Sequence, residues 1–169
     1  MAECKNLDPT ALGLFLVAIV SFALALANLI EPSGATFEPL HLASVFSFIG
    51  ILILFVAYFA YKAESQFGFT VFALVGAGVA LTGMGMGSWE NIVFGIIFVL
   101  TIIWSILAKT PKNLTLILVT TALVFLVVGF MGFTDGDLSK VLGFVALLNG
   151  ILAVYLAFAL ALENKIPVF

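Results

Sequence analysis

Two asparagines lie inside long runs of uncharged, mostly apolar residues. Asn28 is near the end of the first run, and Asn149 is near the middle of the last. An amide side chain has four hydrogen-bonding sites, and its own helix cannot satisfy all of them in hydrocarbon. Each asparagine therefore needs partners on other helices, or water. Two roles stay open for both: contact with a polar solute in a pore, or hydrogen bonds that join helices.

Hydroxyl side chains are the other polar groups in these runs, and Ser21, Thr70 and Thr101 are the candidates for contact with a solute. The alternative is that each hydroxyl donates its hydrogen to a carbonyl of its own helix, which is the favoured interpretation for any single one. The runs contain no carboxylate pair, no metal cluster and no nucleophile with its base. We therefore expect no catalytic residues, no metal and no cofactor, and a protein that is not an enzyme.

The composition places these residues in a membrane. Of the 169 residues, 64% are apolar and only 9% are charged, and the mean hydropathy is +1.32. A water-soluble globule of ordinary composition is far less apolar. Six lysines and no arginine against nine carboxylates give a net charge of −3, which argues against a nucleic-acid partner. The single cysteine excludes an internal disulfide.

Six uncharged runs are each long enough to span a bilayer, at residues 11–30, 41–61, 67–86, 91–108, 114–133 and 141–162. The sequence therefore predicts an all-α membrane protein with six transmembrane helices in each protomer, forming one transmembrane domain over residues 1–169. We expect a multi-pass protein of the cell membrane, in contact with the lipid bilayer.

The lysines predict the orientation. Both termini should be cytoplasmic, because only Lys140 falls on the opposite side from the N-terminus, whereas five lysines fall on the same side: Lys5, Lys62, Lys109, Lys112 and Lys165. All ionisable side chains sit in tails, in loops or in the first turn of a span, and every proline lies outside the spans. The sequence thus shows no proton relay and no broken helices, which favours a rigid, channel-like path.

Small residues at helical spacing predict which faces pack, because close approach holds helices together in lipid. In the first span a small face (Ala18, Ser21, Ala25, Asn28) should meet protein and a bulky stripe (Phe15, Ile19, Phe22, Leu26, Leu29) should meet lipid. Tight packing is also expected at Ala73, Gly76, Ala80 and Gly83, and at Ala146, Gly150, Ala153, Ala157 and Ala161. A face of the fourth span is a candidate pore lining: Asn91, Phe94, Phe98, Thr101 and Ser105.

Short sequence blocks resemble those of a known transporter family. Asp8-Pro9-Thr10-Ala11-Leu12-Gly13-Leu14 is similar to the Asn-Pro-Ala-Pro-Leu-Gly-Leu signature of the acetate uptake transporter family, the succinate and acetate permeases. Phe67-Gly68-Phe69-Thr70-Val71-Phe72 resembles the family's Phe-Gly-Leu-Thr-Ala-Phe, and the last helix, 150–163, is also similar. The chain departs from the first signature at Asp8, Thr10 and Ala11. The matching positions Pro9, Leu12, Gly13 and Leu14 are candidate residues of a solute pathway.

This resemblance implies a homohexamer of six-helix protomers, in which each protomer has its own pore for acetate and related small carboxylates, moved with a proton. It also implies a constriction of the pore formed by residues of the first, third and fifth helices. The corresponding positions here are Val17, Val75 and one residue among 119 to 121, for which Thr121 is our candidate.

The mechanism that we predict is the passage of a small acid as the neutral molecule, or as a partly hydrated anion, because an unpaired carboxylate is costly to desolvate. It would touch Ser21, Asn28, Thr70, Thr101 and Asn149. One alternative is a passive channel for urea or short amides, since Asn149-Gly150-Ile151-Leu152 resembles the Glu-Gly-Ile-Leu of those channels. The second is a membrane assembly protein without a pore, in which Asn28 and Asn149 only join helices.

Overall fold

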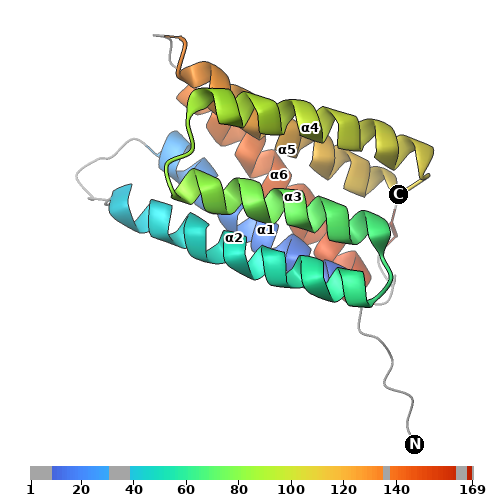
Figure 1. Cartoon of the computed structure of the whole chain (residues 1–169). Coiled ribbons are helices and arrows are strands. Elements are labelled where there is room, and N and C mark those ends of the chain that lie inside the picture. The colour runs from blue at the N-terminus through green and yellow to red at the C-terminus, as the bar shows by residue number, and fades with distance from the viewer. Residues whose placement is uncertain (1–8, 31–38, 135–137, 163–166, 169) are drawn as a thin grey trace, which may run out of the picture.

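Six helices account for almost all of the structure, a computed structural model that describes residues 9–30, 39–134, 138–162 and 167–168. Figure 1 shows them side by side: α1 (Thr10–Leu29), α2 (Pro39–Lys62), α3 (Gln66–Gly83), α4 (Ser88–Leu107), α5 (Lys112–Met131) and α6 (Ser139–Ala161). All six are long and apolar enough to cross a membrane. The predicted all-α, six-helix architecture is confirmed, and the chain is a multi-pass membrane protein.

The helices begin and end close to the predicted limits, with the largest differences at the connection between α3 and α4. The helix α3 ends at Gly83, before the predicted Met86, because the chain turns there with Gly85 in the left-handed region at φ 92°. The Met86 amide then donates back to the Leu81 carbonyl at 2.9 Å. Asp8 lies outside the described residues, as do Lys5 and Lys165, so the predicted orientation of the termini stays a prediction.

The helices pack as three pairs, α1 with α6, α2 with α3, and α4 with α5, while α5 also packs along α6 and α1 along α2. In contrast, α3 barely approaches α1 and α4, and its backbone does not come close to that of α5. Because the backbones of α1, α3 and α5 stay largely apart, side chains and empty space fill the middle of the bundle. This middle region is where a site is expected.

Glycines let α2 and α3 pack backbone to backbone. A Cβ atom on Gly76 would lie 2.9 Å from both the carbonyl oxygen of Gly50 and the amide nitrogen of Leu54. Gly83 meets the backbone of α2 in the same way at Ser47, and Ala80 meets Gly50. The small-residue stripe predicted on the third span therefore does pack tightly, in the manner expected of membrane helices.

We expect Gly76→Leu to destabilise the protein strongly, since the new side chain cannot fit without separating α2 from α3. Overpacking of this kind costs about 1–3 kcal/mol or more. The melting temperature of the purified protein in detergent measures the effect. Ala161→Leu is the matched control, because Ala161 is exposed at the end of α6. An unchanged melting temperature for Gly76→Leu would contradict the backbone contact.

The interface between α1 and α6 confirms one predicted stripe and corrects another. Ala146, Ala153 and Ala157 of α6 are fully buried, but Ala161 is exposed, because it is the last residue of the helix. On α1, Ile19 and Leu26 are exposed, as the prediction of a lipid-facing stripe requires. That prediction is wrong for three residues, which pack on α6: Phe22 lies against Gly150, Phe15 makes an edge-to-face contact with Phe158, and Leu29 lies against Gly143. The small residues of α6 leave room that these side chains fill.

Candidate functional site

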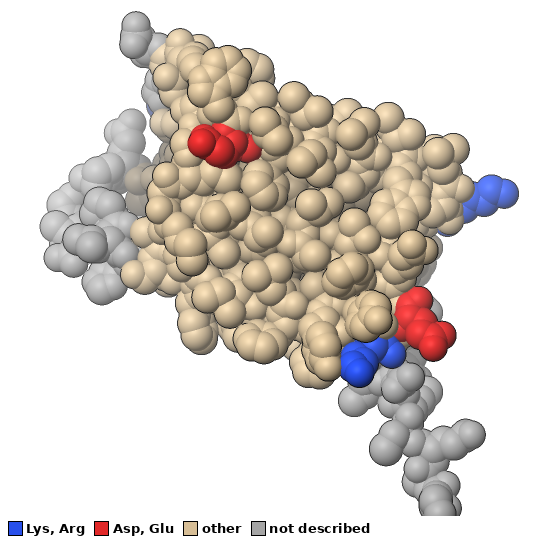
Figure 2. Space-filling model, viewed as in Figure 1, with Lys and Arg blue, Asp and Glu red and all other residues tan. Residues whose placement is uncertain are grey.

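Charged side chains mark the two ends of the bundle. We call the end where α1 begins and α6 ends the near end, and the opposite one the far end. Lys62, Lys109 and Lys112 lie at the near end, and Glu90 and Lys140 lie at the far end. The face seen in Figure 2 carries its charged side chains toward these ends and is uncharged across the middle. This distribution suits a body that spans a membrane.

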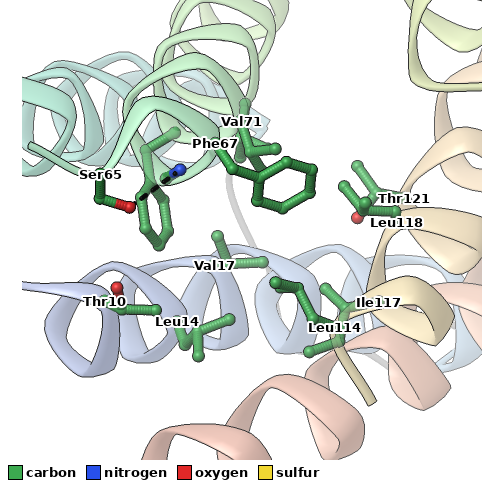
Figure 3. A pocket seen from close by; sticks show the side chains of 13 residues that line it. Thr10, Leu14, Val17, Ser65, Phe67, Val71, Leu114, Ile117, Leu118 and Thr121 are labelled. Atoms are coloured by element: carbon green, nitrogen blue, oxygen red, sulfur yellow. Dashed lines mark hydrogen bonds between the residues drawn. The ribbon is translucent and has the colours of Figure 1, made fainter. Parts of the chain in front are cut away.

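A cavity of about 90 Å³ enters the bundle from the near end, and we call it the near cavity. Figure 3 shows its lining side chains converging from three helices: Leu14 from α1, Val71 from α3 and Ile117 from α5 are among them. Its polar groups are Thr10, Thr121 and Ser65, whose hydroxyl oxygen accepts a hydrogen bond from the Gly68 amide. The walls are otherwise apolar.

A second cavity, of about 310 Å³, occupies the middle and the far part of the bundle, and we call it the far cavity. All six helices contribute to its wall. Its polar side chains are Ser21, Asn28, Thr82, Asn91, Thr121 and Asn149. The other lining residues are apolar, so a few polar groups stand in hydrocarbon walls, as is usual for small-molecule sites.

Three residues line both cavities: Val17 of α1, Val75 of α3 and Thr121 of α5. We call this group the junction. Each is at most 6% exposed. In Figure 3, Val17 extends from α1 and Thr121 from α5. The two cavities therefore meet at three short side chains, one each from α1, α3 and α5.

A hydrogen-bonded cluster centred on Asn149 lies beside the junction. The Asn149 amide nitrogen donates to the Ser21 hydroxyl at 3.0 Å. The Asn149 carbonyl oxygen is 2.6 Å from the Thr120 hydroxyl and 3.4 Å from the Thr121 hydroxyl. These bonds join α1, α5 and α6. They leave the hydroxyl hydrogen of Ser21 and the second amide hydrogen of Asn149 without an acceptor among the described residues, so the cluster offers donors to the far cavity.

Ionisable side chains are absent from the residues that line the two cavities. Of the charged residues in the described part of the chain, all lie at helix ends or in connections. A solute in either cavity is therefore held by neutral hydrogen bonds and apolar contact alone.

Phe125 lines the far cavity and belongs to an aromatic cluster behind the cavity wall. Its ring stacks on those of Phe94 and Phe98, with ring centroids 5.5 Å and 5.3 Å away. The edge of the Phe125 ring fits against Gly78 of α3, where a Cβ atom would lie 2.6 Å from the ring. Each such aromatic pair contributes about 0.5–1.5 kcal/mol beyond the burial of area, which helps to hold the Phe125 ring in the wall.

The structure places the predicted pathway residues in two groups. Leu14, Val17, Val75 and Thr121 line the near cavity, and Val17, Val75, Thr121, Ser21, Asn28 and Asn149 line the far one. Outside both cavities lie Pro9, Leu12, Gly13, Thr70 and Thr101.

The residues outside the cavities have local roles. The Thr70 and Thr101 hydroxyls lie 3.0 Å and 2.7 Å from carbonyl oxygens of their own helices, to which they donate. Leu12 is 55% exposed, and Gly13 packs closely against the ring of Phe72. Pro9 is the N-cap of α1. Of the face of the fourth span that was a candidate pore lining, only Asn91 lines a cavity.

Sequence reasoning did not select several lining residues, notably Phe125, Val79 and Val71. Val71, Val75 and Val79 are spaced four residues apart on α3, so the helical repeat from Val75 is the signal that would have found them.

Asn113 is a buried amide outside both cavities. It is fully buried at the start of α5, and neither its amide nitrogen nor its carbonyl oxygen has a hydrogen-bond partner among the described residues. Such a group destabilises a protein by about 1–3 kcal/mol. It therefore serves below as a matched control for the asparagines that do line a cavity.

No protein-family profile and no curated protein matches this chain by sequence. Among solved structures, the fold matches that of the bacterial acetate channel SatP with a TM-score of 0.82. The match covers 96% of this chain and 99% of that one, at 17% sequence identity. The two chains therefore share one fold over their whole lengths.

Proposed function

We propose that this protein is a channel-like transporter for acetate and related small carboxylic acids, which cross as the neutral acid and so carry their own proton. The observation that carries the proposal is the junction: two cavities from opposite parts of the bundle meet at Val17, Val75 and Thr121, and their linings hold no ionisable side chain. The similarity in fold to the acetate channel SatP supports acetate as the solute.

The physical argument for the neutral acid is the cost of desolvation. An isolated carboxylate loses its favourable hydration on leaving water, and this loss costs far more free energy than moving a hydrogen-bonded neutral group out of water. No lysine, arginine or histidine of the lining offsets that loss. The neutral acid presents one acceptor oxygen and one donor hydroxyl, and the donors beside the junction, Ser21 and Asn149, suit its carbonyl oxygen.

Two further features belong to the proposal. The resemblance to the acetate uptake family supports a homohexamer with one pore in each protomer. The lysines of the near end, Lys62, Lys109 and Lys112, support a cytoplasmic near end and hence cytoplasmic termini. Crosslinking of the purified protein tests the first feature, and cysteine labelling of intact cells tests the second.

The pH dependence of uptake tests the mechanism. In proteoliposomes at fixed total acetate, we expect protein-dependent uptake of labelled acetate to rise as the pH falls through the pKa of acetic acid. The rise should follow the concentration of neutral acid, because no group of the pathway titrates. Vesicles without protein give the rate through lipid, which is subtracted. Uptake that follows the anion concentration at a fixed concentration of neutral acid would refute neutral-acid transport.

A passive channel for urea or short amides is the second candidate, favoured by the donor-rich cluster of Ser21 and Asn149. Neutral amides carry the same donor and acceptor pattern as a neutral acid. Swelling rates of proteoliposomes in urea, formamide and acetate at two pH values separate the candidates, because only the acetate rate depends on pH.

A further inference from the structure

Asn91 lies in the first turn of α4 and lines the far cavity at its far end, away from the junction. The residue is 2% exposed. Its amide nitrogen donates to the Gly87 carbonyl at 2.8 Å and to the Met86 carbonyl at 3.4 Å. Both carbonyls belong to the turn that connects α3 to α4, so the Asn91 side chain anchors that turn.

These two bonds fix which way the amide faces. Exchange of its oxygen and nitrogen would place the Asn91 oxygen against two carbonyl oxygens, which repel it and offer no hydrogen. The nitrogen therefore faces the turn, and both of its hydrogens are used. The carbonyl oxygen is buried and has no hydrogen-bond partner among the described residues.

The other polar groups near the far end do not donate a hydrogen bond to this oxygen. The Thr82 hydroxyl donates to Gly78 at 2.8 Å, and the Asn28 amide donates to Leu24 at 2.8 Å. Apolar side chains of Val128, Met131 and Leu142 complete the wall there. Toward its far end, the far cavity thus has two carbonyl oxygens that accept no hydrogen bond from the described residues, the buried one of Asn91 and that of Asn28, and it has free donors on Ser21 and Asn149 beside the junction.

We propose that the carbonyl oxygen of Asn91 selects solutes that carry a hydrogen-bond donor, by accepting the hydroxyl hydrogen of a protonated carboxylic acid or the N–H of a short amide. This inference rests on the proposed function, since it names a residue that tells the neutral acid from its anion. A carboxylate has only acceptor oxygens, and the Asn91 oxygen repels it. A ligand that leaves a buried acceptor without a hydrogen bond binds more weakly.

The test compares solutes that differ in their donors. Stopped-flow light scattering of proteoliposomes gives permeabilities for acetamide and for dimethyl sulfoxide, a solute of similar size that accepts hydrogen bonds but donates none. Acetic acid at low pH is the third solute, and rates of protein-free vesicles are subtracted. For wild type we expect both donor-bearing solutes to pass faster than dimethyl sulfoxide.

Asn91→Leu should lower the acetamide and acetic acid rates about fivefold, which corresponds to the net free energy of one hydrogen bond. The dimethyl sulfoxide rate should be unchanged. Asn91→Ser is the second variant, in case the leucine variant does not fold. A serine hydroxyl donates to the carbonyl four residues before it, as Thr82 does, and so retains the bond to Gly87 while withdrawing the acceptor. Asn113→Leu is the matched control and should leave all three rates unchanged.

The outcomes separate this inference from the proposed function. If acetic acid passes and its ratio to dimethyl sulfoxide is the same in both Asn91 variants as in wild type, the inference is overturned and the proposed function stands. If acetamide passes in an Asn91-dependent way and acetic acid does not pass, the acetate proposal fails and the donor selection stands. Vesicles with wild-type protein that are no more permeable than empty ones overturn both.

Discussion

Val75→Phe is expected to remove most of the protein-dependent flux of acetate, by at least about tenfold, which corresponds to ~1.4 kcal/mol in the barrier. Val75 is one of the three junction residues, which are the only residues shared by the linings of the near and far cavities in the described part of the chain. Because Val75 lines both cavities, a phenyl ring at this position is expected to extend into them and obstruct the junction. The measurement is labelled acetate uptake into proteoliposomes.

Two further variants make this prediction specific. Val93→Phe is the matched control, since Val93 is 53% exposed on α4 and lines neither cavity, and its flux should equal that of wild type. Val75→Ala shortens the same side chain and should raise flux and admit larger acids. Normal flux through Val75→Phe, in a protein that elutes and melts like wild type, would show that solutes do not pass the junction.

The number, type and approximate limits of the helices follow from the sequence because the bilayer imposes them. A segment that crosses hydrocarbon must satisfy its backbone hydrogen bonds internally and must be about 20 residues long, so apolar runs identify the spans directly. Small residues add packing information, as Gly76 and Ala153 show, since only close approach joins helices in lipid. The same reasoning fails for Phe22, which was expected to face lipid: a bulky residue can face protein when its partner, here Gly150, is small.

The site is harder to predict, because a span that is apolar on every side does not reveal which face meets a cavity. Thr101 and Thr121 have the same residue type and a similar apolar setting. Thr101 donates to its own helix, whereas Thr121 stands at the junction, and only the rotation of α4 and α5 distinguishes them. That rotation depends on contacts between helices far apart in sequence. Phe125 was missed for the same reason, although it follows Thr121 by one helical turn.

Asn149 shows that the two roles considered for the buried asparagines are not exclusive. Its amide joins α1, α5 and α6 through Ser21, Thr120 and Thr121, which is the expected behaviour of a residue that holds membrane helices together. It also lines the far cavity, where its second amide hydrogen is free of described acceptors. A substitution that removes the amide and keeps its shape therefore measures both roles at once.

We expect Asn149→Leu to fold, to melt only a little below wild type, and to lose acetate flux by about tenfold. Interhelical hydrogen bonds in membrane proteins contribute about 0.6 kcal/mol on average, so the loss in stability is small. The partners also have other neighbours: the Thr120 hydroxyl is 3.0 Å from the Ile117 carbonyl, to which it then donates. The loss in flux is larger, because leucine removes the amide donor beside the junction and replaces it with hydrocarbon.

Asn113→Leu is the control that separates the effect on melting temperature from the effect on acetate flux. It makes the same change at an equally buried position outside both cavities, and it removes an amide that has no described partner. Its melting temperature should rise and its acetate flux should not change. If Asn149→Leu instead fails to assemble while flux per folded protein is normal, Asn149 only joins helices. If both variants lose flux equally, the effect of Asn149 does not depend on its place beside the junction.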